Sequence, residues 1–141
     1  MLEAAVEGAC EASRTEPPRV VAVTVLTSLD GSALEELGFH RPPHDVVLGW
    51  ARLARECALA GVVASAQEAA AVRQACGGGF LIVTPGIRPA TSDRDDQRRV
   101  LTPAEAIQAG ADILVVGRPV TRAPDSAAVA RSIVDEMTST V

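Results

Sequence analysis

The chain has 141 residues, of which 48 % are hydrophobic and 22 % are charged, a composition typical of one small folded domain. Its formal net charge of −5, without a basic stripe interleaved with aromatics, excludes general binding to nucleic acid or to anionic membranes. No apolar run approaches the roughly 20 residues that span a bilayer, and the acidic amphipathic start is unlike a signal peptide. We therefore expect a cytoplasmic protein.

An amphipathic segment of helical period opens the chain, and four short, nearly continuous apolar runs follow it. Apolar runs that do not alternate with polar residues are typical of strands buried on both faces of a parallel sheet. The sequence therefore predicts four strands, at Val20–Leu26, Gly61–Ala64, Phe80–Val83 and Ile113–Val116.

Segments of helical period separate the predicted strands. Residues 45–60 place apolar side chains at helical spacing, and residues 125–137 form a closing helix. One helix followed by four strand–helix units predicts an α/β protein with parallel strands and right-handed crossovers. Four such strands leave two unpaired edges and one incompletely covered face, whereas eight units close into a barrel. We therefore expect residues 1–141 to form a single partial domain, one half of a barrel.

Two helices are expected to begin with a capping box, in which a hydroxyl and a carboxylate three residues apart satisfy each other's backbone amides. Ser65 precedes the helical segment 66–76 and stands three residues before Glu68. Thr102 stands three residues before Glu105. These two positions therefore mark where two of the crossover helices are expected to start.

The cysteines and histidines predict neither a disulfide framework nor a metal site. Cys10, Cys57 and Cys76 are odd in number and widely spaced, which favours small buried hydrophobic residues in a reducing compartment. His40 and His44 have helical spacing, but two prolines lie between them and no third ligand is near. Histidines of a surface loop are therefore favoured over a metal pair.

Polar and basic residues follow the predicted strands, at the end where barrels carry their active sites. Thr27 and Ser28 come directly after the first strand, and Gly117-Arg118 after the last. A glycine there lets the backbone approach an anion, and an arginine supplies a bidentate fork, although an ordinary turn with a solvated arginine would have the same sequence. The charged connection 86–101 is long for this type of fold and is typical of a lid, with a plain surface loop as the alternative.

Five segments form a specific combination in their order and spacing. They are VTVLTS (23–28), GVVASAQEA (61–69), LIVTPGIRP (81–89), DQRRVLTPAEAIQAGAD (96–112) and LVVGRPVT (114–121). Together they closely resemble the second half of the bacterial orotidine 5′-monophosphate decarboxylases, and the resemblance covers the whole chain. It implies the C-terminal half of a (β/α)8 TIM barrel, with about four parallel strands and flanking helices. It also implies a lyase of pyrimidine biosynthesis that converts orotidine monophosphate to uridine monophosphate and CO2 without metal or organic cofactor.

The resemblance further implies roles for individual residues in binding a nucleotide substrate. Thr27 would lie at the nucleotide site. Arg88 and Gln97 would come from the loop after the seventh strand of the barrel, with Gln97 bridging pyrimidine and phosphate as the lid closes. Gly117 would offer its backbone amide, and Arg118 its guanidinium, to the phosphate. The binding energy of the phosphate would close the lid and desolvate the pyrimidine.

The family's catalytic element, which alternates carboxylates with a lysine, is absent. The chain contains no lysine, and its thirteen basic residues are all arginines. An arginine does not release its proton near neutral pH, so none can replace the lysine as proton donor. No catalytic residue is therefore assigned, and we expect the chain alone to be inactive. Met1 matches an internal position of the family pattern, so a fragment or a sequence begun at an internal methionine is expected.

Three other hypotheses stay open. The chain could be a non-catalytic half-barrel that binds nucleotide or phosphate, or a piece that self-associates through its open sheet edges. It could also be a sugar-phosphate enzyme of the same superfamily, although the spacing from TPGIRP to GRP favours the decarboxylase. The full-length family is expected to form homodimers with active sites near the subunit interface.

Overall fold

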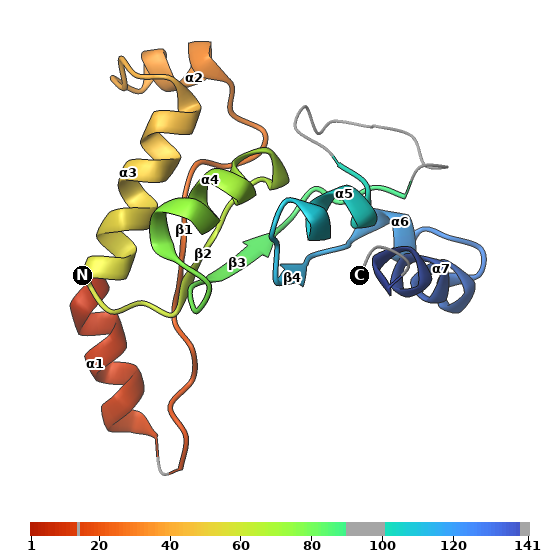
Figure 1. Ribbon diagram of the computed structural model, residues 1–141, viewed down its shortest axis with the longest axis horizontal. Helices are drawn as coiled ribbons and strands as arrows, with labels where there is room; N and C mark the ends of the chain where they lie inside the picture. The colour runs from red at the N-terminus through yellow and green to blue at the C-terminus, as the bar shows by residue number, and fades with distance from the viewer. Residues whose placement is uncertain (14, 90–100, 139–141) are drawn as a thin grey trace.

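A computed structural model of the chain describes residues 1–13, 15–89 and 101–138, and its core is one four-stranded parallel sheet (Figure 1). The strands lie side by side in chain order. They are β1 (Val21–Val23), β2 (Gly61–Val63), β3 (Leu81–Thr84) and β4 (Ile113–Leu114). The helices are α1 (Leu2–Ala12), α2 (Gly31–Glu36), α3 (Pro43–Glu56), α4 (Ala66–Cys76), α5 (Pro103–Gln108), α6 (Arg118–Thr121) and α7 (Ser126–Thr138). The predicted order of one helix and four strand–helix units is confirmed.

Three of the four strands are shorter than the apolar runs that predicted them, whereas β3 has the predicted length but starts one residue later. The first run extends to Leu26, but β1 ends at Val23. Immediately afterwards, the backbone amide and the hydroxyl of Thr24 both donate to the carbonyl of Val63, at 3.1 and 2.7 Å. Thereafter the chain leaves the sheet, while Val25 still packs into the core. The short helices α2 and α6 were not predicted.

The two faces of the sheet differ in how well they are covered. Ala22, Val62 and Ile82 are paired across β1, β2 and β3, and they point toward α3 and α4, which pack side by side. Val62 and Ile82 are fully buried there. The side chains of the opposite face, called the open face below, alternate with these along the strands. The open face consists of Val21, Val23, Val63, Leu81, Val83, Ile113 and Val115.

The open face is apolar and incompletely covered, as the sequence predicted. Val23 is 60 % exposed, and Ile113 and Val115 are 47 % and 48 % exposed. The buried core therefore lies between the sheet and its helices. A second, smaller cluster of Ala66, Ile87, Ala106 and Ala111 joins α4 and α5 to the chain after β3.

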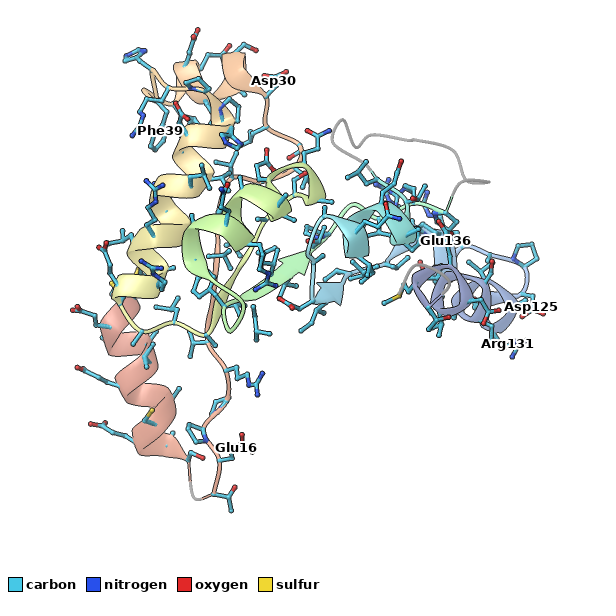
Figure 2. The ribbon with its side chains drawn as sticks, viewed as in Figure 1. Glu16, Asp30, Phe39, Asp125, Arg131 and Glu136 are labelled. Atoms are coloured by element: carbon cyan, nitrogen blue, oxygen red, sulfur yellow. The ribbon has the colours of Figure 1, made fainter. Side chains whose placement is uncertain are left out.

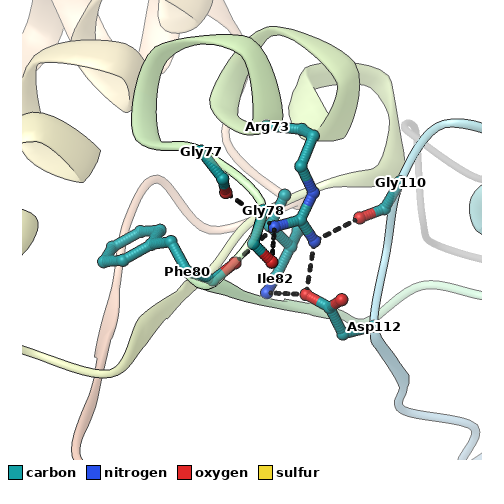
Figure 3. Close-up of polar contacts among 7 residues, drawn as sticks. All are labelled: Arg73, Gly77, Gly78, Phe80, Ile82, Gly110 and Asp112. Carbon is teal, nitrogen blue, oxygen red and sulfur yellow. Dashed lines mark hydrogen bonds and ion pairs between the residues drawn. The ribbon is translucent and has the colours of Figure 1, made fainter.

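One arginine ties three elements together at the amino end of the sheet (Figure 3). Arg73 of α4 donates through Nη1 to three carbonyls, those of Gly77, Gly78 and Phe80, at 2.9, 3.1 and 2.7 Å. Its Nη2 donates to the Gly110 carbonyl at 2.9 Å and to Asp112 Oδ2 at 2.6 Å. This set of bonds is called the Arg73 clamp below.

The Arg73 clamp extends into the sheet through Asp112. The same Oδ2 accepts from the Ile82 amide of β3 at 2.8 Å, and the Asp112 amide donates to the Ile82 carbonyl at 3.0 Å. The carboxylate thus acts as an additional link between β3 and the residue before β4. The clamp therefore holds the end of α4, the start of β3 and the turn before β4 in one arrangement.

The expectations for cysteine and histidine need two corrections. Cys76 is buried, and burial raises the pKa of its thiol against the opposing effect of nearby guanidinium groups. Cys57 is only partly buried, and Cys10 is exposed, so the prediction of three buried cysteines is wrong for Cys10. The helix α3 is amphipathic and begins at Pro43, which places His44 in its exposed first turn rather than in a loop.

Gly61 of β2 is expected to be intolerant of any side chain. A Cβ at this position would overlap the backbone carbonyl of Leu81 on the neighbouring strand. Gly61→Ala should lower the free energy of unfolding by roughly 1–3 kcal/mol, because the strands would have to move apart. Gly49→Ala is the matched control: Gly49 lies within α3 with open space beside it, so alanine should raise stability by about 0.5–1 kcal/mol. Urea unfolding measures both, and equal stability of the two variants would contradict the account.

The Arg73 clamp gives a second prediction. Arg73→Met keeps the aliphatic stem but removes every bond of the guanidinium, so the free energy of unfolding should fall by roughly 2–4 kcal/mol. Arg73→Lys retains the charge without the planar fork and should fall between wild type and Arg73→Met. Urea denaturation of the three proteins tests this order. A methionine variant as stable as wild type would show that the clamp does not hold the fold.

Candidate functional site

The carboxyl ends of the parallel strands lie at one end of the sheet, and the sequence predicts the site residues there. In Figure 2, Glu16 before β1 lies at the bottom of the view and Asp30 after β1 lies at the top. A cleft of about 340 Å³ opens at the Asp30 end of the sheet. It is lined by Val23, Val25, Leu26, Thr27, Ser28, Val63, Ala64 and Pro85. The structure therefore places Thr27 in a cleft formed by the ends of three strands.

The chain around Thr27 is held from both sides. Before it, the Val25 side chain is 5 % exposed and belongs to the main core. After it, the Leu29 amide donates to the Leu26 carbonyl at 3.0 Å, and Asp30 caps α2 by accepting from the Ala33 amide at 3.0 Å. A buried anchor and a helix cap thus fix the turn that presents Thr27 to the cleft.

The chain after β3 turns sharply at Gly86, whose φ of 79° is in the left-handed region that glycine adopts without strain. Ile87 is fully buried and forms a parallel bridge with Leu101, and the Arg88 amide donates to the Leu101 carbonyl at 3.1 Å. The first and last residues of the long connection are therefore paired with each other. Gln97, predicted from this connection, lies outside the described residues.

Arg88 is buried, with only 7 % of its surface exposed. Among the residues that the structure describes, its guanidinium donates through Nη1 to the Ile87 carbonyl at 3.3 Å. Arginine is rarely buried unless acceptors or an anion compensate for its lost hydration. The sequence predicted Arg88 at this strand end but not its burial, which makes it a largely desolvated cation after β3 rather than a solvated one.

The chain after β4 presents Gly117 and Arg118. The Val115 amide donates to the Thr84 carbonyl at 2.8 Å, which keeps this strand end next to that of β3. Gly117 precedes α6, and its carbonyl accepts from the amide of Val120 at 3.0 Å. A Cβ at Gly117 would meet no atom within 4 Å, so the space beside its backbone is open. An anion can therefore approach the backbone here closely.

The four predicted site residues that the structure describes follow the carboxyl ends of the strands, and they fall into two groups. Thr27 lies in the cleft, whereas Arg88, Gly117 and Arg118 follow the next two strands and are not among its lining residues. Sequence reasoning missed Pro85, which lines the cleft directly after β3, although it stands in the TPGIRP motif.

In residues 1–13, 15–89 and 101–138, no group of three or more histidine, cysteine, aspartate or glutamate side chains could hold a metal ion. No helix within these ranges is long and apolar enough to cross a membrane.

The sequence profile of the Orotidine 5'-phosphate decarboxylase / HUMPS family matches residues 1–133. The chain belongs to this family. It is 56 % identical over 135 residues to the orotidine 5'-phosphate decarboxylase of Moorella thermoacetica, covering 95 % of this chain and 54 % of that protein. It is 50 % identical over 131 residues to the enzyme of the same name from Trichlorobacter lovleyi, covering 93 % and 54 %. The chain thus spans about half the length of the curated relatives it matches.

Solved structures give the same picture. Orotidine 5'-phosphate decarboxylase from Lactobacillus acidophilus superposes with a TM-score of 0.82 at 34 % identity, covering 97 % of this chain and 58 % of that one. An uncharacterized conserved protein from Geobacillus kaustophilus superposes with a TM-score of 0.79 at 38 % identity and the same coverage. The predicted fold, the C-terminal half of a TIM barrel with four parallel strands and flanking helices, is confirmed. The roles of the individual site residues stay predictions.

The predicted capping boxes are found in full at α5 and in part at α4. Thr102 Oγ1 accepts from the Glu105 amide at 3.3 Å, and Glu105 Oε2 accepts from the Thr102 amide at 2.8 Å. At α4, the Ser65 hydroxyl accepts from the amide of Gln67, one residue earlier than Glu68. The box at α5 fixes the point where the long connection returns to the fold.

Removing the α5 cap should loosen this return point. Thr102→Ala is expected to lower the free energy of unfolding by about 1 kcal/mol, because the hydroxyl loses its bonds to the amide and to the carboxylate of Glu105 at the start of a six-residue helix. It should also speed amide hydrogen exchange in α5 more than in α4. Thr138→Ala is the control, since Thr138 is an exposed residue at the end of α7. Equal exchange in α5 of both variants would contradict a role for the cap.

Proposed function

We propose that this chain is the phosphate-binding half of an orotidine 5′-phosphate decarboxylase, which as a whole converts orotidine monophosphate to uridine monophosphate and CO2. The observation that carries the proposal is the placement of Arg88 and Gly117-Arg118 at neighbouring strand ends of a half-barrel of this family. Barrels commonly bind phosphate in the loops after their last two strands.

In the proposed contacts, the residues after β3 and β4 bind the phosphate, and the cleft binds the rest of the nucleotide. Gly117 would donate its backbone amide to the phosphate, and Arg118 would bind two phosphate oxygens with its planar fork. Arg88 would add a second, buried positive charge. Thr27, in the cleft, would contact the nucleotide itself, and Gln97 would bridge the pyrimidine and the phosphate.

The phosphate lies far from the carbon that reacts, so its binding energy can be used to change the surroundings of that carbon. We propose that this energy favours a closed arrangement in which the pyrimidine is desolvated and its carboxylate destabilised. The apolar lining of the cleft, with Val23, Val63 and Pro85, is suited to a ring that has lost its water. The chain's own residues would thus bind and orient the substrate.

The proton that replaces CO2 must come from elsewhere. The chain has no lysine, and its arginines keep their protons at neutral pH, so we assign it no catalytic residue and expect it to be inactive alone. The lysine would come from the other half of the barrel. The proposed reaction needs no metal or organic cofactor and no nucleic acid, and we propose a cytoplasmic location.

One alternative of a different class remains as a proposal. The missing lysine favours a non-catalytic half-barrel that binds nucleotide or phosphate, and the family description includes HUMPS proteins as well as decarboxylases. A decarboxylase half should bind uridine monophosphate much better than inorganic phosphate or a sugar phosphate. A module for phosphate alone would bind all three alike.

We also propose that the full-length protein forms a homodimer and that the isolated chain self-associates. The support for self-association is the open face together with the outer edges of β1 and β4, since exposed edges template further strand pairing.

Titration calorimetry with uridine monophosphate tests the binding half of the proposal. Wild type should bind, and Arg118→Ala should bind roughly 10–100-fold more weakly, because one charged pair with phosphate contributes about 1.5–3 kcal/mol. Arg122→Ala is the matched control, since Arg122 is an exposed arginine one helical turn later. It should bind like wild type.

The outcomes separate the hypotheses. Equal weakening by both arginine variants would indicate a general charge effect and would contradict the role of Arg118. A folded wild-type chain that binds no uridine monophosphate would show that the phosphate site is not preformed in this half.

A further inference from the structure

Thr24 stands where the chain leaves the sheet and enters the cleft. It comes directly after β1 and is buried. Its backbone amide and its hydroxyl both donate to the carbonyl of Val63, at 3.1 and 2.7 Å. Within the described residues, no backbone amide of residues 25–29 donates to β2, and the Leu29 amide donates back to the Leu26 carbonyl. Thr24 is therefore the last backbone attachment of this segment to the neighbouring strand.

The hydroxyl of Thr24 does something that strand formation does not require. Any residue other than proline could donate its backbone amide to Val63. A valine would have the same branched shape, and strands favour it equally. Burying a hydroxyl instead costs free energy unless the hydroxyl is hydrogen-bonded. The bond from Thr24 Oγ1 to the Val63 carbonyl meets that cost and adds a second link at the same point.

The residue that accepts both bonds is itself part of the cleft. Val63 lines the cleft together with Val25 and Thr27, which follow Thr24 in the chain. A carbonyl oxygen has two lone pairs, and Thr24 supplies a donor for each. The Val63 carbonyl therefore needs no water to complete its hydrogen bonds, and this wall of the cleft keeps its apolar character.

We infer that Thr24 is a positioning residue of the cleft. Its hydroxyl fixes the place where the chain leaves β1, and so holds Val25 and Thr27 against Val63. This positioning rests on the fold alone. Its effect on the reaction rests on the proposed function, in which the cleft binds the part of the nucleotide beyond the phosphate.

Thr84 offers a matched comparison within the same sheet. Thr24 and Thr84 each stand one residue beyond a paired valine, Val23 and Val83. Thr84 is fully buried, yet its hydroxyl has no hydrogen-bond partner among the residues that the structure describes. The same change from threonine to valine thus removes a bond at one position and none at the other.

The proposed phosphate residues are separate from this link. Arg88, Gly117 and Arg118 follow β3 and β4, whereas Thr24 follows β1. Loss of the Thr24 hydroxyl should therefore leave the grip on the phosphate intact and impair the placement of the reacting ring. An interaction that acts mainly on the transition state lowers kcat and kcat/KM together, with little change in KM.

Kinetics of a fusion test the effect on the reaction. The part of the Moorella thermoacetica relative that this chain does not match is joined before residue 1. In this fusion, Thr24→Val should lower kcat roughly 3–10-fold, the equivalent of about one hydrogen bond, and leave KM nearly unchanged. Thr24→Ser keeps the hydroxyl and should restore kcat. Thr84→Val is the matched control and should behave like wild type.

Hydrogen exchange of the 141-residue chain tests the positioning without any reaction. In Thr24→Val the Leu29 amide, which closes the turn around Thr27, should exchange roughly 3–10-fold faster. The Asp112 amide, which bonds to the Ile82 carbonyl in the Arg73 clamp, should be unchanged. Thr84→Val should alter neither amide. If circular dichroism shows that Thr24→Val is unfolded, Thr24→Cys, with its weaker donor, replaces it in both measurements.

The results separate positioning from general stability and from the proposed function. Equal kcat in Thr24→Val and Thr84→Val, or unchanged exchange at Leu29, would overturn the inference. Faster exchange at Leu29 and Asp112 alike would show a loss of overall stability and would also overturn it. An inactive wild-type fusion would contradict the decarboxylase proposal alone, and the exchange of the Leu29 amide would then decide the inference.

Discussion

The arrangement of this half-barrel depends on one guanidinium at the amino end of the sheet. The Arg73 clamp joins the end of α4, the start of β3 and, through Gly110 and Asp112, the turn that leads into β4. Asp112 and Ile82 also exchange two bonds, so the clamp holds the β3–β4 register. That register determines where the chain after β4 emerges relative to the chain after β3. An interaction at one end of the barrel thus positions the candidate phosphate residues at the other, the usual division between stability and function in this architecture.

Much of the fold could be predicted because its signals are local. The bounds of α4 match the predicted segment 66–76, since Ser65 caps its start and Gly77, with φ of 87°, ends it. Strand lengths could not be predicted equally well, because an apolar run indicates that side chains are buried but does not indicate where the backbone pairs with another strand. Val25 is apolar because it packs into the core after β1 has ended. The helices α2 and α6, of six and four residues, are too short for a helical period to be recognised.

The candidate site was predictable in its position but not in its geometry. Thr27, Arg88 and Gly117 follow apolar strands, and parallel pairing alone brings them to one edge. The burial of Arg88 and the cleft contact of Pro85 arise from packing between strands, which no local pattern encodes. The Arg73–Asp112 pair escaped notice for the same reason, because its members are 39 residues apart. The exposed Cys10 shows the limit of composition, since an amphipathic helix can present a cysteine on either side.

We propose that this chain holds the phosphate end of a decarboxylase active site and lacks only what the other half of the barrel supplies. The most direct test of this proposal is a fusion in which the part of the Moorella thermoacetica relative that this chain does not match precedes residue 1. The measurement is formation of uridine monophosphate from orotidine monophosphate. The account predicts activity in the fusion and none in the 141-residue chain. A folded fusion that forms no product, or a lysine-free chain that decarboxylates alone, would contradict it.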